Sequence, residues 1–189
     1  MIQMNNTLIL CDIDGTLIDS DSLNSYSYIT AIEQLGFDVP PELKNIRRIT
    51  EKELRSCMPL LSEEDIIQIK ELKLDLFLKN INMLRLNSKL LDEIANSGAA
   101  VCICTSSKIE RAESECKLLD IHYDAIISST KTKAELERIV NELAEAFCDF
   151  EKIICYDDDE DVLKAAADCG FETVLVKFAK GDQKDLAML

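Results

Sequence analysis

An apolar run that ends in two closely spaced carboxylates constrains this chain more than any other stretch. Residues 8–17 read LILCDIDGTL, so four apolar residues are followed by Asp12, Asp14 and Gly15. A short, continuous apolar run of this kind is typical of a buried strand in a parallel sheet. Open α/β sheets place their ligands at the carboxyl ends of such strands. Because two desolvated acids are costly unless a cation or a substrate compensates them, the stretch indicates a functional site.

The charge of the chain restricts the partners that it can bind. Its 189 residues are 47% hydrophobic and 30% charged, with a formal net charge of -15 at pH 7. Nucleic acids and anionic membrane surfaces both need a basic footprint, so we expect neither as a partner. A phosphorylated substrate would also be repelled, and a bound divalent cation with a few local basic residues would have to overcome that repulsion.

The N-terminal sequence and the longest apolar runs bear on location. The first residues, MIQMNN, lack the basic segment and the apolar stretch of a signal peptide. No run has the apolar length that is needed to cross a bilayer. We therefore expect a cytoplasmic protein without a membrane partner.

The remaining apolar runs alternate with helical patterns and predict an α/β fold. The expected strands are residues 8–11, 99–104, 125–127, 152–156 and 172–176. Strands separated by helices imply a doubly wound parallel sheet with right-handed crossovers. From about residue 19 to 86 only helical patterns occur. We therefore predict an α/β core domain formed by 1–18 and 87–189, with a helical domain of residues 19–86 inserted between its first two strands.

Three of the predicted strands deliver chemically different polar residues to their carboxyl ends. The first ends in Asp12 and Asp14, the second in Thr105, and the fourth in the acidic cluster 157–161. Lysines 131 and 133 stand at the start of the helix that precedes the fourth strand. A nucleophilic carboxylate, an acid/base, a hydroxyl, a cation and oxygen ligands for a hard metal together indicate phosphoryl transfer.

The run from Asp12 to Leu17, continued by Asp19 and Ser20, resembles the first motif of the haloacid dehalogenase-like (HAD) phosphohydrolase superfamily. The chain is similar to the members with small helical caps, of the phosphoglycolate phosphatase and β-phosphoglucomutase type. The resemblance implies the strand order 3-2-1-4-5, which places the first, second and fourth strands side by side. It also implies a Mg²⁺-dependent phosphatase that hydrolyses a small phosphorylated metabolite through an aspartyl-phosphate.

The resemblance assigns roles to individual residues. Asp12 is expected to be the nucleophile and a metal ligand, while Asp14 is expected to be the acid/base, with its backbone carbonyl on the metal. Thr105 resembles the hydroxyl residue that holds phosphoryl oxygens, although it could instead cap the following helix. The other expected phosphate contacts are Gly15, Thr16 and Ser106.

Three assignments stay open at this point. The family needs a lysine near a helix start, and we favour Lys133 while Lys131 remains a candidate. Asp158 matches the principal metal ligand, with Asp157 beside it, but a second register makes Asp157 that ligand and pairs it with Asp161. Arg47 and Arg48 in the helical insert are either contacts for an anionic substrate group or a solvated pair.

Two other functions share these features. A phosphomutase of the β-phosphoglucomutase type has the same motifs and cap, and differs only in passing the phosphoryl group to a second sugar hydroxyl. A non-catalytic binding protein could also use the fold, but it would have no need of the acid/base residue. Either a monomer or a homodimer is compatible with the sequence.

Overall fold

A computed structural model describes residues 6–178 of the chain. Within that range the chain divides into two compact units, one formed by residues 6–19 with 86–178 and the other by residues 20–85. The assignment of residues 1–5 and 179–189 to a core domain lies outside the described residues. We refer to the first unit as the core unit and to the second as the helical unit.

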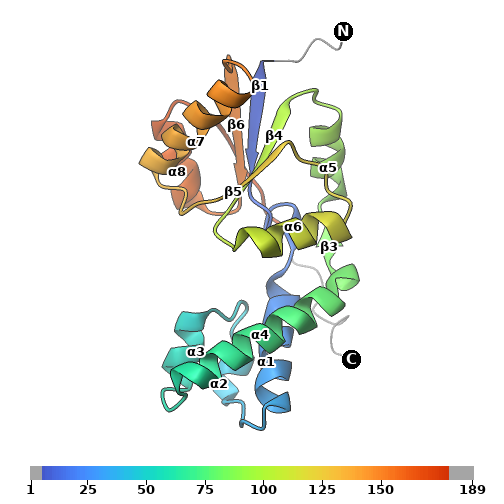
Figure 1. Ribbon diagram of the computed structural model, residues 1–189, viewed down its shortest axis with the longest axis vertical. Coiled ribbons are helices and arrows are strands. Elements are labelled where there is room, and N and C mark those ends of the chain that lie inside the picture. Colours follow the sequence, from blue (N-terminus) through green and yellow to red (C-terminus); the bar gives the residue numbers. More distant parts are fainter. Residues whose placement is uncertain (1–5, 179–189) are drawn as a thin grey trace. The chain divides into compact units, whose positions relative to one another are not determined.

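The core unit is built on a five-stranded sheet. Its strands, in spatial order, are β5 (Ala125–Ser128), β4 (Ala100–Thr105), β1 (Thr7–Cys11), β6 (Lys152–Asp157) and β7 (Glu172–Leu175). All neighbouring pairs are parallel. Counted among these five strands alone, the order is 3-2-1-4-5, so the predicted doubly wound α/β fold is confirmed. The first strand, β1, therefore lies between β4 and β6 at the centre of the sheet (Figure 1).

Helices cover both faces of this sheet. They are α5 (Ser88–Ala95), α6 (Ile109–Leu118), α7 (Lys133–Ala146) and α8 (Glu160–Asp168). Helices α7 and α8 lie on one face and α5 lies on the other (Figure 1). Successive strand residues point to opposite faces, so Leu8 and Leu10 of β1 pack with Leu136 and Ile139 of α7 in one buried cluster. Apolar burial of this kind is the main force that holds the strand ends in register.

Two short strands that the sequence did not indicate flank the inserted segment. Strands β2 (Ile18–Asp19) and β3 (Arg85–Leu86) form a two-stranded sheet. The expectation of helices alone between residues 19 and 86 is therefore wrong at its two ends. Two-residue strands carry no period-2 pattern, so hydrophobicity could not reveal them.

The helical unit contains α1 (Asp21–Gln34), α2 (Pro41–Lys44), α3 (Glu51–Cys57), α4 (Glu63–Lys79) and the 3₁₀ turn Ile81–Met83. Thr50 and Glu53 form a capping box at the start of α3, and Ser62 and Asp65 form a second box on α4. Apolar residues of α1 and α4 share one buried cluster. Among the described residues, no helix has the length and apolar character needed to span a membrane.

Candidate active site

The carboxyl ends of β4, β1 and β6 bring together the polar residues that the sequence singled out. Register places Cys11 of β1 beside Ile103 of β4 and Tyr156 of β6. Asp12 follows Cys11 and Asp157 follows Tyr156, and both acids are buried. On β4 the buried Thr105 stands two residues after Ile103. Three chain segments far apart in the sequence therefore end at one edge of the sheet.

Asp12 and Asp157 share one buried cation, Lys131. The Nζ atom of Lys131 lies 2.7 Å from Oδ1 of Asp12 and 2.7 Å from Oδ2 of Asp157. Burial acts to lower the pKa of Lys131, but the two carboxylates outweigh it and the net pKa is raised. Lys131 is therefore held as a full positive charge against both acids.

Burial raises the pKa of Asp12 to about 7, even though Lys131 acts to lower it and Asp157 adds to the rise. Desolvation thus outweighs a single ion pair at this position. A carboxylate kept in so little water is a better nucleophile than a solvated one, but it needs further positive charge to be ionised at neutral pH.

The backbone at Lys131 explains how this side chain reaches the acids. Its φ of 56° lies in the left-handed region, which non-glycine residues rarely adopt. The Lys131 N–H donates to Oγ of Ser129 at 2.9 Å. The hydroxyl of Ser129 donates to the carboxylate of Glu135, which also accepts the N–H of Thr130 at 3.0 Å. Glu135 in the first turn of α7 thereby ties down the loop that presents Lys131.

Lys133, the lysine that the sequence favoured, lies away from the two acids. Lys133 is the first residue of α7, its side chain is 52% exposed, and its Nζ lies 3.7 Å from Oε1 of Glu137 one turn along the helix. Thr132 caps the helix, so Lys131 lies outside it, where the left-handed loop turns its side chain inward. The structure therefore places Lys131, and not Lys133, beside Asp12.

Three carboxylates form a group that fits a divalent metal. Oxygen atoms of Asp12, Asp157 and Asp158 all lie within 4.8 Å of one another, with the first two residues buried and Asp158 exposed. A hard cation such as Mg²⁺ prefers oxygen ligands and usually takes few carboxylates together with water and substrate oxygens. The donor set therefore suits Mg²⁺.

The rest of the acidic cluster serves the helix. Asp159 is the N-cap of α8, and its Oδ1 accepts the N–H of Asp161 at 2.8 Å. Asp157 accepts the N–H of Asp159 through its other oxygen, Oδ1, at 2.9 Å. Asp161 is not a member of the three-carboxylate group. Both Asp157 and Asp158 thus stay candidate ligands, but the geometry does not favour the register that uses Asp161.

Glycine at position 15 lets Asp158 approach. Gly15 has a φ of 84°, and a Cβ atom built there would lie 2.6 Å from Cγ of Asp158. Any side chain at this position would collide with that carboxylate. The absence of a side chain at Gly15 thus leaves room for the Asp158 carboxylate beside the first motif.

Asp14 points to a different set of partners. Nη2 of Arg111 lies 2.9 Å from its Oδ1 and 3.2 Å from its Oδ2, and the hydroxyl of Ser107 donates to Oδ2 at 3.1 Å. Nε of Arg111 in turn donates to Oε1 of the buried Glu115, at 2.6 Å. The carboxylate of Asp14 is not a member of the metal-like group around Asp12. The two acids of the first motif therefore have separate counter-charges.

The remaining predicted contacts differ in burial. Thr105 is buried, and its Oγ1 accepts the N–H of Ser107 at 3.1 Å, which shapes the loop before α6. Lys108, and not Thr105, is the N-cap of α6. Thr16 is buried and Ser106 is exposed. The hydroxyl of Thr105 is thus held at the strand end, where the sequence predicted it.

The two arginines of the helical unit contact an acid within that unit. Nε of Arg47 lies 2.8 Å from Oδ2 of Asp21, and Nη1 of Arg48 lies 3.6 Å from Oδ1 of the same residue. A role for them in substrate binding stays a prediction.

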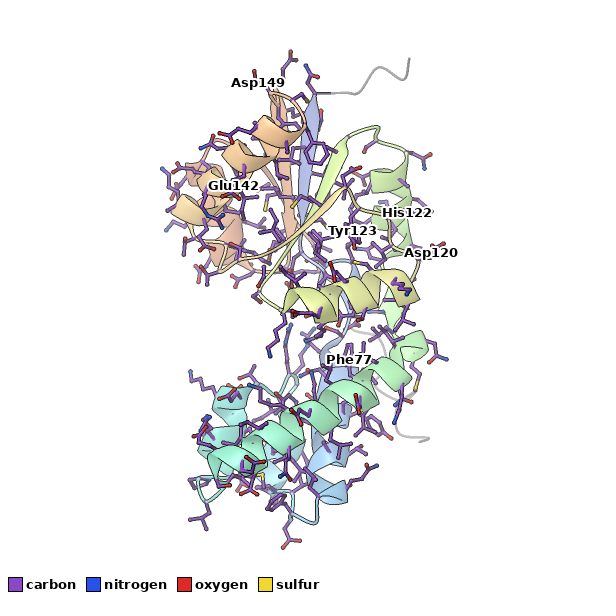
Figure 2. All side chains as sticks on the ribbon, viewed as in Figure 1. Phe77, Asp120, His122, Tyr123, Glu142 and Asp149 are labelled. Carbon is purple, nitrogen blue, oxygen red and sulfur yellow. The ribbon has the colours of Figure 1, made fainter. Side chains whose placement is uncertain are left out.

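His122 is exposed in the loop before β5, at the amino end of that strand (Figure 2).

Sequence reasoning missed residues that hold the predicted ones in place. They are Ser107, Arg111, Glu115, Ser129 and Glu135. One signal was available, because Arg111 and Glu115 are four residues apart and so share a helix face. A second signal is that Arg111 lies in the first turn of its helix, where a positive charge opposes the helix dipole. Its presence there therefore needs an explanation other than helix stability.

A family model covers most of the chain. The sequence profile of the haloacid dehalogenase-like hydrolase family matches residues 9–176. A comparison with curated proteins gave no match.

Solved structures share the fold at low sequence identity. A candidate beta-phosphoglucomutase from Thermotoga maritima has a TM-score of 0.69 and 20% identity, over 96% of this chain and 90% of that one. A predicted phosphoglycolate phosphatase from Haemophilus somnus has a TM-score of 0.67 and 15% identity, over 91% and 86%. CbbY from Rhodobacter sphaeroides, solved in complex with phosphate, has a TM-score of 0.62 and 17% identity, over 95% and 90%.

Proposed function

The chain belongs to the haloacid dehalogenase-like hydrolase family, and we propose that it is a Mg²⁺-dependent phosphatase of small phosphate monoesters. One observation carries the proposal. The buried carboxylate of Asp12 contacts Lys131 and lies among two further acids at the centre of the sheet edge. A nucleophile, a fixed cation and oxygen ligands for a metal are thus within reach of one phosphoryl group.

Asp12 acts first. Its carboxylate oxygen forms a bond to phosphorus while the ester oxygen leaves, and Asp14 gives that oxygen a proton. The products of this step are the free alcohol and an aspartyl-phosphate on Asp12. Lys131 offsets part of the charge that gathers on the phosphoryl oxygens, and the hydroxyl of Thr105 is available to donate to one of them.

Hydrolysis of the aspartyl-phosphate completes the cycle. Asp14, now ionised, takes a proton from water, and the water oxygen attacks phosphorus to displace the carboxylate of Asp12. Inorganic phosphate leaves, and both acids return to their starting states. The same carboxyl group thus serves as acid in one step and as base in the next.

The residues that would hold Mg²⁺ are the side chains of Asp12, Asp157 and Asp158 together with the backbone carbonyl of Asp14. When bound, the ion would supply the positive charge that lets two anions, a carboxylate and a phosphate ester, approach each other. The three-carboxylate group supports this assignment, since two of its acids are buried and the three carboxylates together carry more negative charge than Lys131 alone can offset.

The substitution Asp12→Asn tests the mechanism. We expect loss of phosphate release from 4-nitrophenyl phosphate and from a panel of sugar phosphates and phosphoglycolate in Mg²⁺, with an unchanged circular-dichroism spectrum. Full turnover by this variant would refute the aspartyl-phosphate. If the wild-type protein hydrolyses no member of the panel, a non-catalytic binding protein becomes the better proposal.

A phosphomutase remains the second candidate because it would use the same residues. Incubation with a hexose 1-phosphate separates the two activities. A phosphatase releases inorganic phosphate, whereas a mutase yields the isomeric sugar phosphate. We expect free phosphate as the main product.

A further inference from the structure

We propose that Arg111, oriented by Glu115, is a positioning residue for Asp14. The inference rests on the proposed function, in which Asp14 protonates the leaving oxygen. It adds a residue pair on α6 that no motif of the sequence indicated. All of the residues involved lie in the core unit.

The contacts around Asp14 leave its carboxylate little freedom. Arg111 donates to both of its oxygens, and Ser107 donates to one of them, from the loop that precedes α6. The side chain of Asp14 is only 4% exposed. General acid catalysis requires a group held within hydrogen-bonding reach of the atom that it protonates, so a fixed orientation has direct value here.

Glu115 fixes the arginine in turn. Its Oε1 accepts from Nε of Arg111 at 2.6 Å, and its side chain is 0% exposed. The pair is one helical turn apart, so the backbone of α6 sets the distance between them. Two buried carboxylates therefore face opposite sides of one guanidinium, whose planar donors suit such an arrangement.

Stability alone does not account for this arrangement. Arg111 is in the first turn of α6, where a positive charge opposes the helix dipole. A buried ion pair is often no more stabilising than apolar residues of the same size. The cluster instead resembles the environment of Asp12, which has a cation of its own in Lys131. Asp12 and Asp14 are thus each held by a different cation, Lys131 for the first and Arg111 for the second.

A comparison of two aryl phosphates tests the inference. Phenyl phosphate and 4-nitrophenyl phosphate are similar in size, but 4-nitrophenolate leaves readily without a proton and phenolate does not. The ratio kcat/KM reports all steps up to departure of the phenol, so it isolates the step in which Asp14 acts as an acid. Loss of a merely structural contact would lower kcat/KM for both esters alike.

We expect Arg111→Met to lower kcat/KM for phenyl phosphate by about 10²-fold and that for 4-nitrophenyl phosphate by less than about threefold. Asp14→Asn should show the same selectivity. The double variant Arg111→Met with Asp14→Asn should lose no more kcat/KM for phenyl phosphate than Asp14→Asn alone. Arg111→Lys, which keeps the charge, should recover part of the loss.

Two further variants keep the test decisive. Arg111→Met takes the guanidinium away from both Asp14 and Glu115, so the paired variant Arg111→Met with Glu115→Met also removes the buried acid that has no role in proton transfer. Arg138→Met is the matched control, because Nη1 of Arg138 lies 2.7 Å from Oε1 of Glu142, four residues away on α7, and both side chains are about half exposed. Glu142 is labelled in Figure 2. Arg138→Met should leave kcat/KM unchanged for both esters.

An equal loss for the two esters, or no loss, in a folded Arg111 variant would overturn the inference and leave the proposed function intact. Activity that persists in Asp12→Asn would instead refute the proposed function itself.

Discussion

Replacement of Lys131 by methionine removes a cation that lies between two buried acids. Its Nζ lies 2.7 Å from each of Asp12 and Asp157, and the side chains of the three residues are at most 8% exposed. Loss of one partner of a buried ion pair costs roughly 3–5 kcal/mol, because the remaining charge is left unpaired in a desolvated place. In Lys131→Met two carboxylates would be left, so we expect a cost at the upper end of that range at pH 8.

Urea unfolding of the metal-free protein in EDTA measures this cost. Mg²⁺ should restore part of the lost stability, since another cation then neutralises the same carboxylates. Activity should fall about 10²–10³-fold even in saturating Mg²⁺, because a preorganised charge at the phosphoryl group is lost. The two readouts separate the structural contribution of the lysine from its catalytic one.

Lys133→Met is the matched control, two residues away. Lys133 is half exposed and its Nζ lies 3.7 Å from Oε1 of Glu137, so its loss should change the free energy of unfolding by less than about 0.5 kcal/mol. If Lys133→Met lost as much activity as Lys131→Met, or if Lys131→Met cost less than about 1 kcal/mol, the reasoning from the buried contacts would be wrong.

Two further predictions concern the metal and the pH. Gly15→Ala should weaken activation by Mg²⁺, measured as the concentration for half-maximal activity, because the new Cβ would lie 2.6 Å from Cγ of Asp158. Gly98 has a φ of 66°, and no atom lies within 4 Å of a Cβ built there. Gly98→Ala should therefore have a similar backbone cost without weakening activation by Mg²⁺. Because the pKa of Asp12 is raised from 3.8 to about 7, its ionisation should lower the stability of the metal-free protein as the pH rises between those values, and not above them. The stability of Asp12→Asn relative to wild type should therefore increase by up to about 4 kcal/mol from pH 4 to pH 8 in urea titrations, and no change with pH would contradict the pKa shift.

The sequence predicted those parts of the site that depend on periodicity and on strand ends. Apolar runs located the five strands of the core sheet, and the acids that follow β1 and β6 could only lie at their carboxyl ends. The strand order came from the family resemblance, because an apolar run does not specify its neighbours. Asp12, Thr105 and Asp157 thus lie at the carboxyl ends of neighbouring strands.

Long-range side-chain contacts lie beyond that kind of reasoning. Arg111 is 97 residues from Asp14 in the sequence, and the helical pattern of α6 does not predict which residue Arg111 contacts. Lys131 was undervalued for a different reason. Its position depends on a left-handed backbone conformation that Ser129 and Glu135 stabilise from neighbouring positions, and local propensity assigns such a conformation to glycine.

The separate supports of Asp12 and Asp14 have an evolutionary consequence. The two acids are two residues apart in the chain, yet one is served by the loop before α7 and the other by α6. Substitutions on α6 can therefore retune proton transfer while the nucleophile keeps its surroundings. Such modularity would let one scaffold diversify toward leaving groups of different basicity without rebuilding the step that forms the covalent bond.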